Sequence, residues 1–431
     1  MKVVERTQGV TLAPRVRRRR WPMMVTVVVL GTGMAYSLLW GPVVRHQGSW
    51  VFPGDIWGAY RSAHFVAWGS FGSVYAASTS IVTFPGILML FAPLAMFTGS
   101  LGMTESFPFF PPHPAAWLLL GPYEILIGCV ALFACDALAE RLEVSSGRRV
   151  VLCVVEGVVL WPVLVAWGHP EDALALALAV YAMVFALDHR WTGAGWLFGA
   201  AIATQPLVVL MLPVVLAMSG KRQAPALLLR SGLPAIVLLA TPLVAQFHAT
   251  AHVLLAQPNF PRIDHATPWT ALAPKLGGAG KDIAVAAGPG RVVAVVGACV
   301  LGWWARRWRD RPDLLVWAAA TALTLRCLTE SVMDDYYVWP TLALGLIVAA
   351  RMTRWRQTVG VLVAVAVTVC AQTHFGEWLW WSTVNAGLLI VLVSAFPAMA
   401  SRVRHMVPID LNAAEIEPAQ THPRALAGAI R

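Results

Sequence analysis

Asp55 is the residue of this chain best placed to do chemistry, because it follows directly after the first apolar stretch long enough to span a membrane. It stands between Pro53-Gly54 and Ile56-Trp57. A Pro-Gly turn would end the preceding segment and orient the next side chain. A lone aspartate there can act as a general base that takes a proton from a hydroxyl group. The other interpretation is a helix N-cap, since residues 56–71 are expected to be helical and Asp is favoured at that position.

A second group of titratable side chains lies at the junction of two later apolar stretches, in the segment His169-Pro170-Glu171-Asp172. Acidic residues at a helix start are favoured by the helix dipole alone. Histidine and two carboxylates together also suit a metal ion or the hydroxyl groups of a sugar. No second cluster with metal-ligand spacing accompanies this segment, so metal binding is the weaker interpretation. We therefore predict neither a metal nor a cofactor.

Two more polar groups interrupt the apolar C-terminal half. Arg326 precedes Glu330 by four residues, a spacing that predicts an ion pair on one helix. The alternative is a phosphate clamp, for which guanidinium geometry is suited. Asp334-Asp335-Tyr336-Tyr337 has the same ambiguity, because its tyrosines also suit the aromatic belt of a membrane interface. A charge at membrane depth costs at least about 2.5–3.5 kcal/mol, so such groups usually face a cavity and serve a function.

The elements that position these side chains must be membrane-spanning helices. The chain has 431 residues, of which 58% are hydrophobic and only 13% charged, against roughly 25% charged in soluble proteins. A span takes about 20 apolar residues, and backbone groups in lipid must find partners within their own helix. We predict an all-α polytopic protein with about 10–12 transmembrane helices. Ten full spans are expected at 21–44, 115–139, 150–167, 172–188, 232–250, 288–305, 313–328, 336–350, 358–373 and 379–398.

The basic residues predict the topology. They form short clusters between apolar stretches, as the positive-inside rule expects, so the net charge of +10 does not indicate nucleic-acid binding. Clusters at Arg15–Arg20, Arg306–Arg311, Arg351–Arg356 and Arg402–Arg404 are predicted to be cytoplasmic, and so are both termini. Three regions follow: a basic cytoplasmic N-terminus (1–20), a transmembrane domain (21–399) and a disordered cytoplasmic tail (400–431). Residues 45–79 form the first outer loop, with short interfacial helices.

Residues 80–218 allow two topologies. If Arg141, Arg148, Arg149 and Arg190 are cytoplasmic, the apolar stretch 80–98 is only half embedded. The stretch 193–218 is then a broken hairpin with Gln205-Pro206 at its tip, since it is too short for two crossings and proline breaks a helix. The competing topology has twelve plain spans and leaves those four arginines outside. The positive-inside rule favours the first topology, which collects most of the acidic and histidine side chains at the outer face.

Several motifs together resemble the GT-C glycosyltransferases, and most closely glycosyltransferase family 87. This family holds the actinobacterial mannosyltransferases that depend on polyprenol-phosphate mannose. The order of motifs is a first span, an outer Asp55, a Tyr60-Arg61 helix, and then Phe84-Pro85 and Ala92-Pro93-Leu94. Two later segments agree: Ala194–Ala201 running into Gln205-Pro206 and Leu212-Pro213, and Asp335-Tyr336-Tyr337-Val338-Trp339-Pro340. The family usually carries Lys where this chain has Gln205.

The resemblance implies a GT-C-like fold and an inverting transfer on the outer face of a bacterial cell membrane. A sugar, most often mannose, would move from a polyprenyl-phosphate donor to a glycolipid or lipid-linked glycan acceptor among membrane lipids. Asp55 would be the general base. The residues expected to bind substrate are Arg61, His169, Glu171, Asp172, Gln205, Arg326, Glu330, Asp334, Asp335 and Tyr336. Two alternatives remain: a lipid or sugar flippase, and a catalytically inactive scaffold of the cell-envelope machinery.

Overall fold

The computed structural model describes residues 19–44, 54–76, 83–102, 114–261, 265–277, 283–373 and 375–397. The predicted cytoplasmic tail, most of the basic N-terminus and much of the first outer loop lie outside these ranges. The described chain is almost entirely helical. Its N-terminal half contains α2 (Arg20–Val44), α3 (Gly54–Ala67), η1 (Phe71–Ser73), α4 (Pro85–Ser100), α5 (Pro114–Arg141), α6 (Ser146–Trp161), η2 (Pro162–Trp167), α7 (Pro170–Leu187), α8 (Trp191–Thr204), η3 (Pro206–Met211) and α9 (Leu212–Met218).

The C-terminal half adds two small antiparallel sheets between its helices. Its elements are α10 (Ala224–Ala245), α11 (Phe247–Ala256), β1 (His265–Ala266), η4 (Thr270–Leu272), β2 (Lys275–Gly277), β3 (Ala284–Val285), α12 (Gly290–Ala305), η6 (Arg306–Trp308), α13 (Pro312–Thr329), β4 (Val332–Met333), η7 (Asp335–Val338), α14 (Trp339–Ala349), α15 (Arg354–Ala371) and α16 (Glu377–Ala395). Strand β1 pairs with β4, and β2 pairs with β3. The sheets therefore tie the segment between α11 and α12 to the segment between α13 and α14.

Seven helices of the described residues are long and apolar enough to cross a membrane. They confirm an all-α membrane protein. Six of them agree with predicted spans to within five residues at each end, and Ala224–Ala245 begins eight residues before the predicted span 232–250. The seven are Arg20–Leu39, Leu118–Arg141, Ser146–Trp167, Pro170–Leu187, Ala224–Ala245, Arg354–Ala371 and Glu377–Ala395. The three other predicted full spans are helices too. They do not qualify because α12 and α14 are shorter, and α13 carries Asp313 and Arg326 within its 18 residues.

Arginine contacts join many helix ends at one end of the bundle. Arg149 donates to both carboxylate oxygens of Asp136 at 2.7 Å, and Arg19 contacts the same carboxylate. Arg148 donates to the backbone oxygens of Ala350 (3.0 Å) and Met352 (2.6 Å), which precede α15. These contacts put the start of α2, the end of α5, the start of α6 and the start of α15 together. We call this the basic end.

Further arginines extend the basic end to the ends of α9 and α7. Arg309, after η6, donates to the backbone oxygens of Ala217 (2.7 Å) and Ser219 (2.8 Å) at the end of α9. Arg141 pairs with Asp188 at the end of α7 at 2.8 Å. Arg141, Arg148 and Arg149 therefore lie at the same end as the 306–311 and 351–356 clusters. This placement supports the first of the two topologies and contradicts the second.

The stretch 193–218 is the predicted broken hairpin. Helix α8 starts beside Arg190 and ends at Thr204, and Gln205 then adopts an extended conformation. Pro206 starts the 3-10 turn η3, and α9 leads back to Ser219 at the basic end.

Two glycines allow close packing of α8. A Cβ on Gly199 would lie 2.5 Å from the backbone oxygen of Arg230 in α10, and a Cβ on Gly86 of α4 would lie 2.6 Å from that of Ala203.

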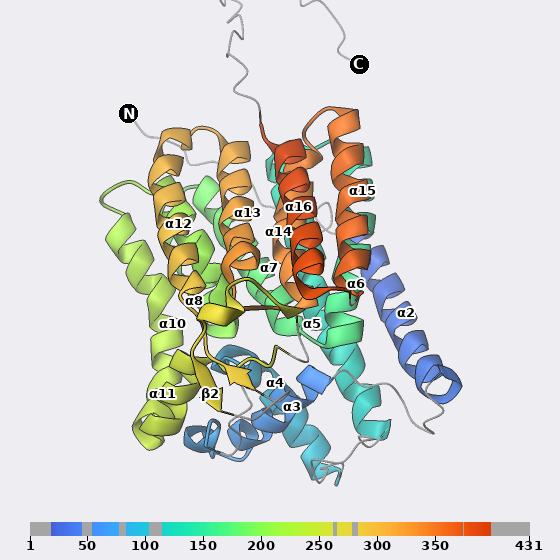
Figure 1. Cartoon of the computed structure of the whole chain (residues 1–431), viewed down its shortest axis with the longest axis vertical. Helices are drawn as coiled ribbons and strands as arrows, with labels where there is room; N and C mark the ends of the chain where they lie inside the picture. The colour runs from blue at the N-terminus through green and yellow to red at the C-terminus, as the bar shows by residue number, and fades with distance from the viewer. Residues whose placement is uncertain are drawn as a thin grey trace, which may run out of the picture. The chain divides into compact units, whose positions relative to one another are not determined.

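The stretch 80–98 forms α4, one of the shorter apolar helices, and it packs against α3 and α8. Figure 1 shows α3 and α4 at the opposite end of the bundle from the loop that joins α12 to α13 and from the start of α15. Ile56, Tyr60, Ile87, Leu88 and Phe91 are fully or almost fully buried between the two helices. Helices α3 and α4 therefore form a packed helical layer at this end of the long helices, and α3 and η1 are short helices within the predicted loop 45–79.

Candidate functional site

A cluster of titratable side chains lies at the end of the bundle opposite the basic end, and His169 is at its centre. Its Nε2 lies 2.9 Å from Oδ2 of Asp55, and its Nδ1 lies 2.8 Å from Oε1 of Glu171. Oδ2 of Asp172 lies 3.6 Å from the same Nδ1. The imidazole also stacks on the ring of Tyr336, with centroids 3.7 Å apart. Four predicted site residues thus meet at one histidine.

The local sequence explains why His169 points into this cluster. Pro162 has no N–H for the regular helix pattern, and residues 162–167 form a π-helical turn, a distortion common at functional sites. Gly168 follows with φ of +74°, a conformation that glycine adopts without strain. The His169 N–H then bonds the oxygen of Val163 at 2.9 Å. Pro170 starts α7, so Glu171 and Asp172 occupy its first turn.

Asp55 is not an N-cap in this structure. Helix α3 begins at Gly54, and Asp55 is the second residue of its first turn. Its side chain is 55% exposed, whereas that of His169 is 11% exposed. Burial raises the pKa of Asp55, but the hydrogen bond and charge of His169 outweigh burial, so its pKa is below the usual value. Asp55 is therefore an accessible carboxylate that is hydrogen-bonded to a buried imidazole.

Burial and neighbouring charges act in opposite directions on the pKa of His169. Burial by itself lowers the pKa of the imidazole, but the negative charges of Glu171 and Asp55 and the hydrogen bonds to both raise it well above the usual value. A histidine held between two carboxylates is therefore charged at neutral pH when nothing else binds there. In this form it donates both ring protons and fixes the orientation of Asp55.

Arg326 and Glu330 do form the predicted pair, but loosely. The Nε atom of Arg326 lies 3.7 Å from Glu330, too far for a hydrogen bond. Arg291, at the start of α12, instead donates to both oxygens of Glu330 at 2.8 and 3.0 Å. The guanidinium of Arg326 lies over the ring of Tyr337, 3.2 Å from its centroid. Glu330 is thus neutralised mainly by Arg291, and the charge of Arg326 also acts on Asp172.

Most of the remaining predicted residues contact other polar or aromatic side chains. Gln205, at the tip of the broken hairpin, forms a side-chain hydrogen bond with Asp172. Tyr336 donates to Asp334 at 3.0 Å, and Asp335 lies 3.2 Å from His265 of β1. Tyr336 and Tyr337 therefore pack on His169 and Arg326 and are not belt residues. Arg61 is six residues beyond Asp55 on α3, a spacing that turns it about 120° away around the helix.

Three neighbours of the cluster were not among the predicted site residues. Arg291 neutralises Glu330, and His265 stacks on Trp380 with centroids 3.5 Å apart. Glu124 of α5 is fully buried, and neither carboxyl oxygen has a hydrogen-bond partner in the described structure. Glu124 and Arg291 both had a signal in the sequence, because each is a charged residue inside a predicted span. His265 is brought to Asp335 by a tertiary contact.

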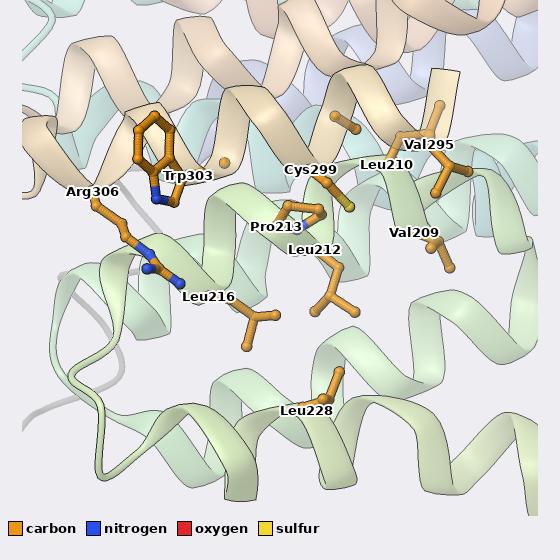
Figure 2. Close-up of a pocket in the computed structure, with 12 residues that line it drawn as sticks. Val209, Leu210, Leu212, Pro213, Leu216, Leu228, Val295, Cys299, Trp303 and Arg306 are labelled. Carbon is orange, nitrogen blue, oxygen red and sulfur yellow. The ribbon is translucent and has the colours of Figure 1, made fainter. Parts of the chain in front are cut away.

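A separate cavity of about 320 Å³ lies between η3, α9, α10 and α12. Figure 2 shows Pro213, Leu216, Leu228 and Cys299 around it, with Arg306 at one side. Its lining is apolar apart from that arginine and includes no acidic or histidine side chain. It is suited to hydrocarbon and does not belong to the titratable cluster.

No protein-family model, curated protein or solved structure matches this chain.

Proposed function

We propose that this chain is a GT-C-like glycosyltransferase that moves a sugar, most often mannose, from a polyprenyl phosphate to a lipid-linked or cell-envelope glycan. The observation that carries the proposal is the Asp55–His169 pair. An accessible carboxylate with a lowered pKa is hydrogen-bonded to a buried histidine, at the end of the bundle opposite the arginines. By the positive-inside rule, that end faces outward. A lipid-phosphate donor and a glycan acceptor would meet there.

In this mechanism Asp55 takes the proton of the acceptor hydroxyl as its oxygen attacks the anomeric carbon of the donor sugar. The bond between that carbon and the phosphate oxygen breaks, the polyprenyl phosphate leaves, and the anomeric configuration inverts. His169 holds the carboxylate and stabilises its charge. Arg326 is the proposed phosphate contact in place of the lysine that the resembled family carries at Gln205, because its Nε has no hydrogen-bond partner in the described structure.

The test is Asp55→Asn, assayed in membranes with a radiolabelled polyprenyl-phosphate mannose. The amide keeps the size of the side chain and still accepts a hydrogen bond from His169, but it is not a base. We expect transfer to fall about 10²–10⁴-fold, the usual contribution of general base catalysis. Asp313→Asn, which changes an aspartate at the basic end, is the matched control and should transfer normally. Unchanged transfer by Asp55→Asn would remove Asp55 as the base.

One observation favours the flippase alternative. Besides Glu124, the described spans contain a second fully buried carboxyl group without a hydrogen-bond partner, that of Glu156 in α6. Buried acids within spans are typical of proton pathways in transporters. A glycosyltransferase has no need for Glu156, so its replacement separates the two functions.

A further inference from the structure

The His169 cluster has more carboxylate oxygens than its hydrogen bonds satisfy. Both nitrogens of His169 are used, by Asp55 and Glu171. Oε2 of Glu171, Oδ2 of Asp172 and both oxygens of Glu124 are nevertheless buried with no hydrogen-bond partner in the described structure. An unpaired buried carboxylate is costly, and such groups normally have a partner.

The charges of the cluster do not balance either. Asp55, Glu171 and Asp172 place carboxylate oxygens 2.8–3.6 Å from a single imidazole. The charge of Arg326 also acts on Asp172, but the Nε atom of Arg326 lies 3.7 Å from Glu330 as well. Three carboxyl groups thus share one imidazole and part of the charge of one guanidinium, so acidic groups are in excess. A bound cation would offset this excess.

The spacing of the ligand atoms fits one ion. Two ligands about 2.1 Å from a metal, at tetrahedral or octahedral angles, lie about 3.0–3.4 Å apart. Nδ1 of His169 is 2.8 Å from Glu171 and 3.6 Å from Asp172, values that bracket this range. One atom from each of the three residues lies within 4.8 Å of the others, and no other group in the described ranges meets this criterion.

We propose that His169, Glu171 and Asp172 bind a divalent transition-metal ion. One imidazole nitrogen with carboxylate oxygens is a donor set for Mn²⁺ or Zn²⁺. The ion takes the place of the proton that Nδ1 otherwise carries, because a ligating histidine must be neutral. Nε2 keeps its proton and donates it to Asp55, which is the carboxylate–histidine–metal arrangement of known metal sites. The site does not depend on sugar transfer.

The experiment uses the full-length protein, purified in detergent and stripped with a chelator, with Mn²⁺ as the probe. We expect one Mn²⁺ per chain and a ¹⁴N coupling in its electron spin-echo spectrum, from the imidazole nitrogen. His169→Gln should abolish the coupling, and Glu171→Gln and Asp172→Asn should each weaken binding at least about tenfold. His265→Gln is the matched control, since it alters the other buried histidine–carboxylate pair, and it should bind like the original chain.

The contrary results are equally clear. Absence of stoichiometric binding, or bound Mn²⁺ without ¹⁴N coupling, overturns the proposal. Equal affinity in Asp172→Asn and in His265→Gln does the same. If His169→Gln does not purify as a monodisperse protein, the ¹⁴N coupling of the unsubstituted chain decides by itself. Excess Zn²⁺ should displace the Mn²⁺, as expected of a site with an imidazole ligand.

Discussion

Buried carboxyl groups in this chain are of two kinds, and the difference predicts how each responds to substitution. Asp136 is paired with two arginines, and its side chain is 3% exposed. Glu156, one helix away in α6, is 1% exposed and has no hydrogen-bond partner among the described residues. The carboxylate of Asp136 is stabilised by its arginine partners. The carboxyl oxygens of Glu156 form no hydrogen bond that would offset the cost of their burial.

We therefore expect Glu156→Met to stabilise the protein, because methionine fills a similar volume without a buried unpaired carboxyl. The gain should be about 1–3 kcal/mol, measured as a longer half-life at elevated temperature in detergent. Asp136→Asn should do the opposite, because it removes the buried charge that Arg149 and Arg19 share and leaves only the more exposed Glu140 to pair with them. Sugar transfer by Glu156→Met should be unchanged. If that variant instead loses a proton-coupled lipid transport activity, the flippase interpretation holds and the transferase proposal fails.

At the scale of elements, the site depends on where the broken hairpin ends. Gln205 reaches Asp172 because α8 stops at Thr204 and lies close against α10 and α4. Gly199 permits one of these contacts, since a Cβ there would lie 2.5 Å from the backbone oxygen of Arg230 and 2.7 Å from Pro234. Backbone cannot yield as a flexible side chain can, so α8 itself would have to shift.

Gly199→Ala should therefore destabilise the fold by roughly 1–3 kcal/mol, as expected of overpacking. Because the shift is passed along α8 to Gln205, it should also lower sugar transfer. The matched control is Gly232→Ala in α10, where an added methyl group would meet nothing closer than 3.8 Å. Thermal half-lives and transfer rates of the two variants should separate clearly. Identical behaviour would show that α8 has room to move without disturbing the site.

At the scale of the whole molecule, the two ends differ in charge, and this asymmetry predicts orientation. Arginines join helix ends at one end, and the His169 cluster lies at the other. The positive-inside rule places the arginine end in the cytoplasm. Gly147 lies in the first turn of α6 at the basic end, and Leu272 lies in η4, with 61% of its surface exposed.

Cysteines introduced at these two positions, in a background without the six native cysteines, test the orientation. A membrane-impermeant thiol reagent should label Leu272→Cys in intact cells. It should label Gly147→Cys only after the membrane is permeabilised. Labelling of both in intact cells would revive the topology of twelve plain spans. The reverse pattern would place the His169 cluster in the cytoplasm, away from a donor on the outer leaflet.

The positions of most helices were predictable because they depend on hydropathy and charge, which are local properties of the sequence. Apolar length identifies the spans, so the predicted 21–44 and the observed Arg20–Val44 nearly coincide. Arginine clusters predicted the topology of 80–218, including a hairpin tip at Gln205-Pro206. The count of 10–12 spans stays a prediction: seven described helices are long and apolar enough to span a membrane, whereas α12 and α14 are shorter than 18 residues and Asp313 and Arg326 lower the hydropathy of α13.

The sequence by itself determined that this is a helical membrane protein with its polar chemistry at one end, because hydropathy and charge act residue by residue along the chain. Only the tertiary structure decided which polar groups meet. Asp55 and His169 are 114 residues apart in sequence and 2.9 Å apart in space. Glu330 is hydrogen-bonded by Arg291, 39 residues earlier in the sequence, and not by Arg326, which is one helical turn away. Such contacts follow from how helices pack, and no local spacing encodes them.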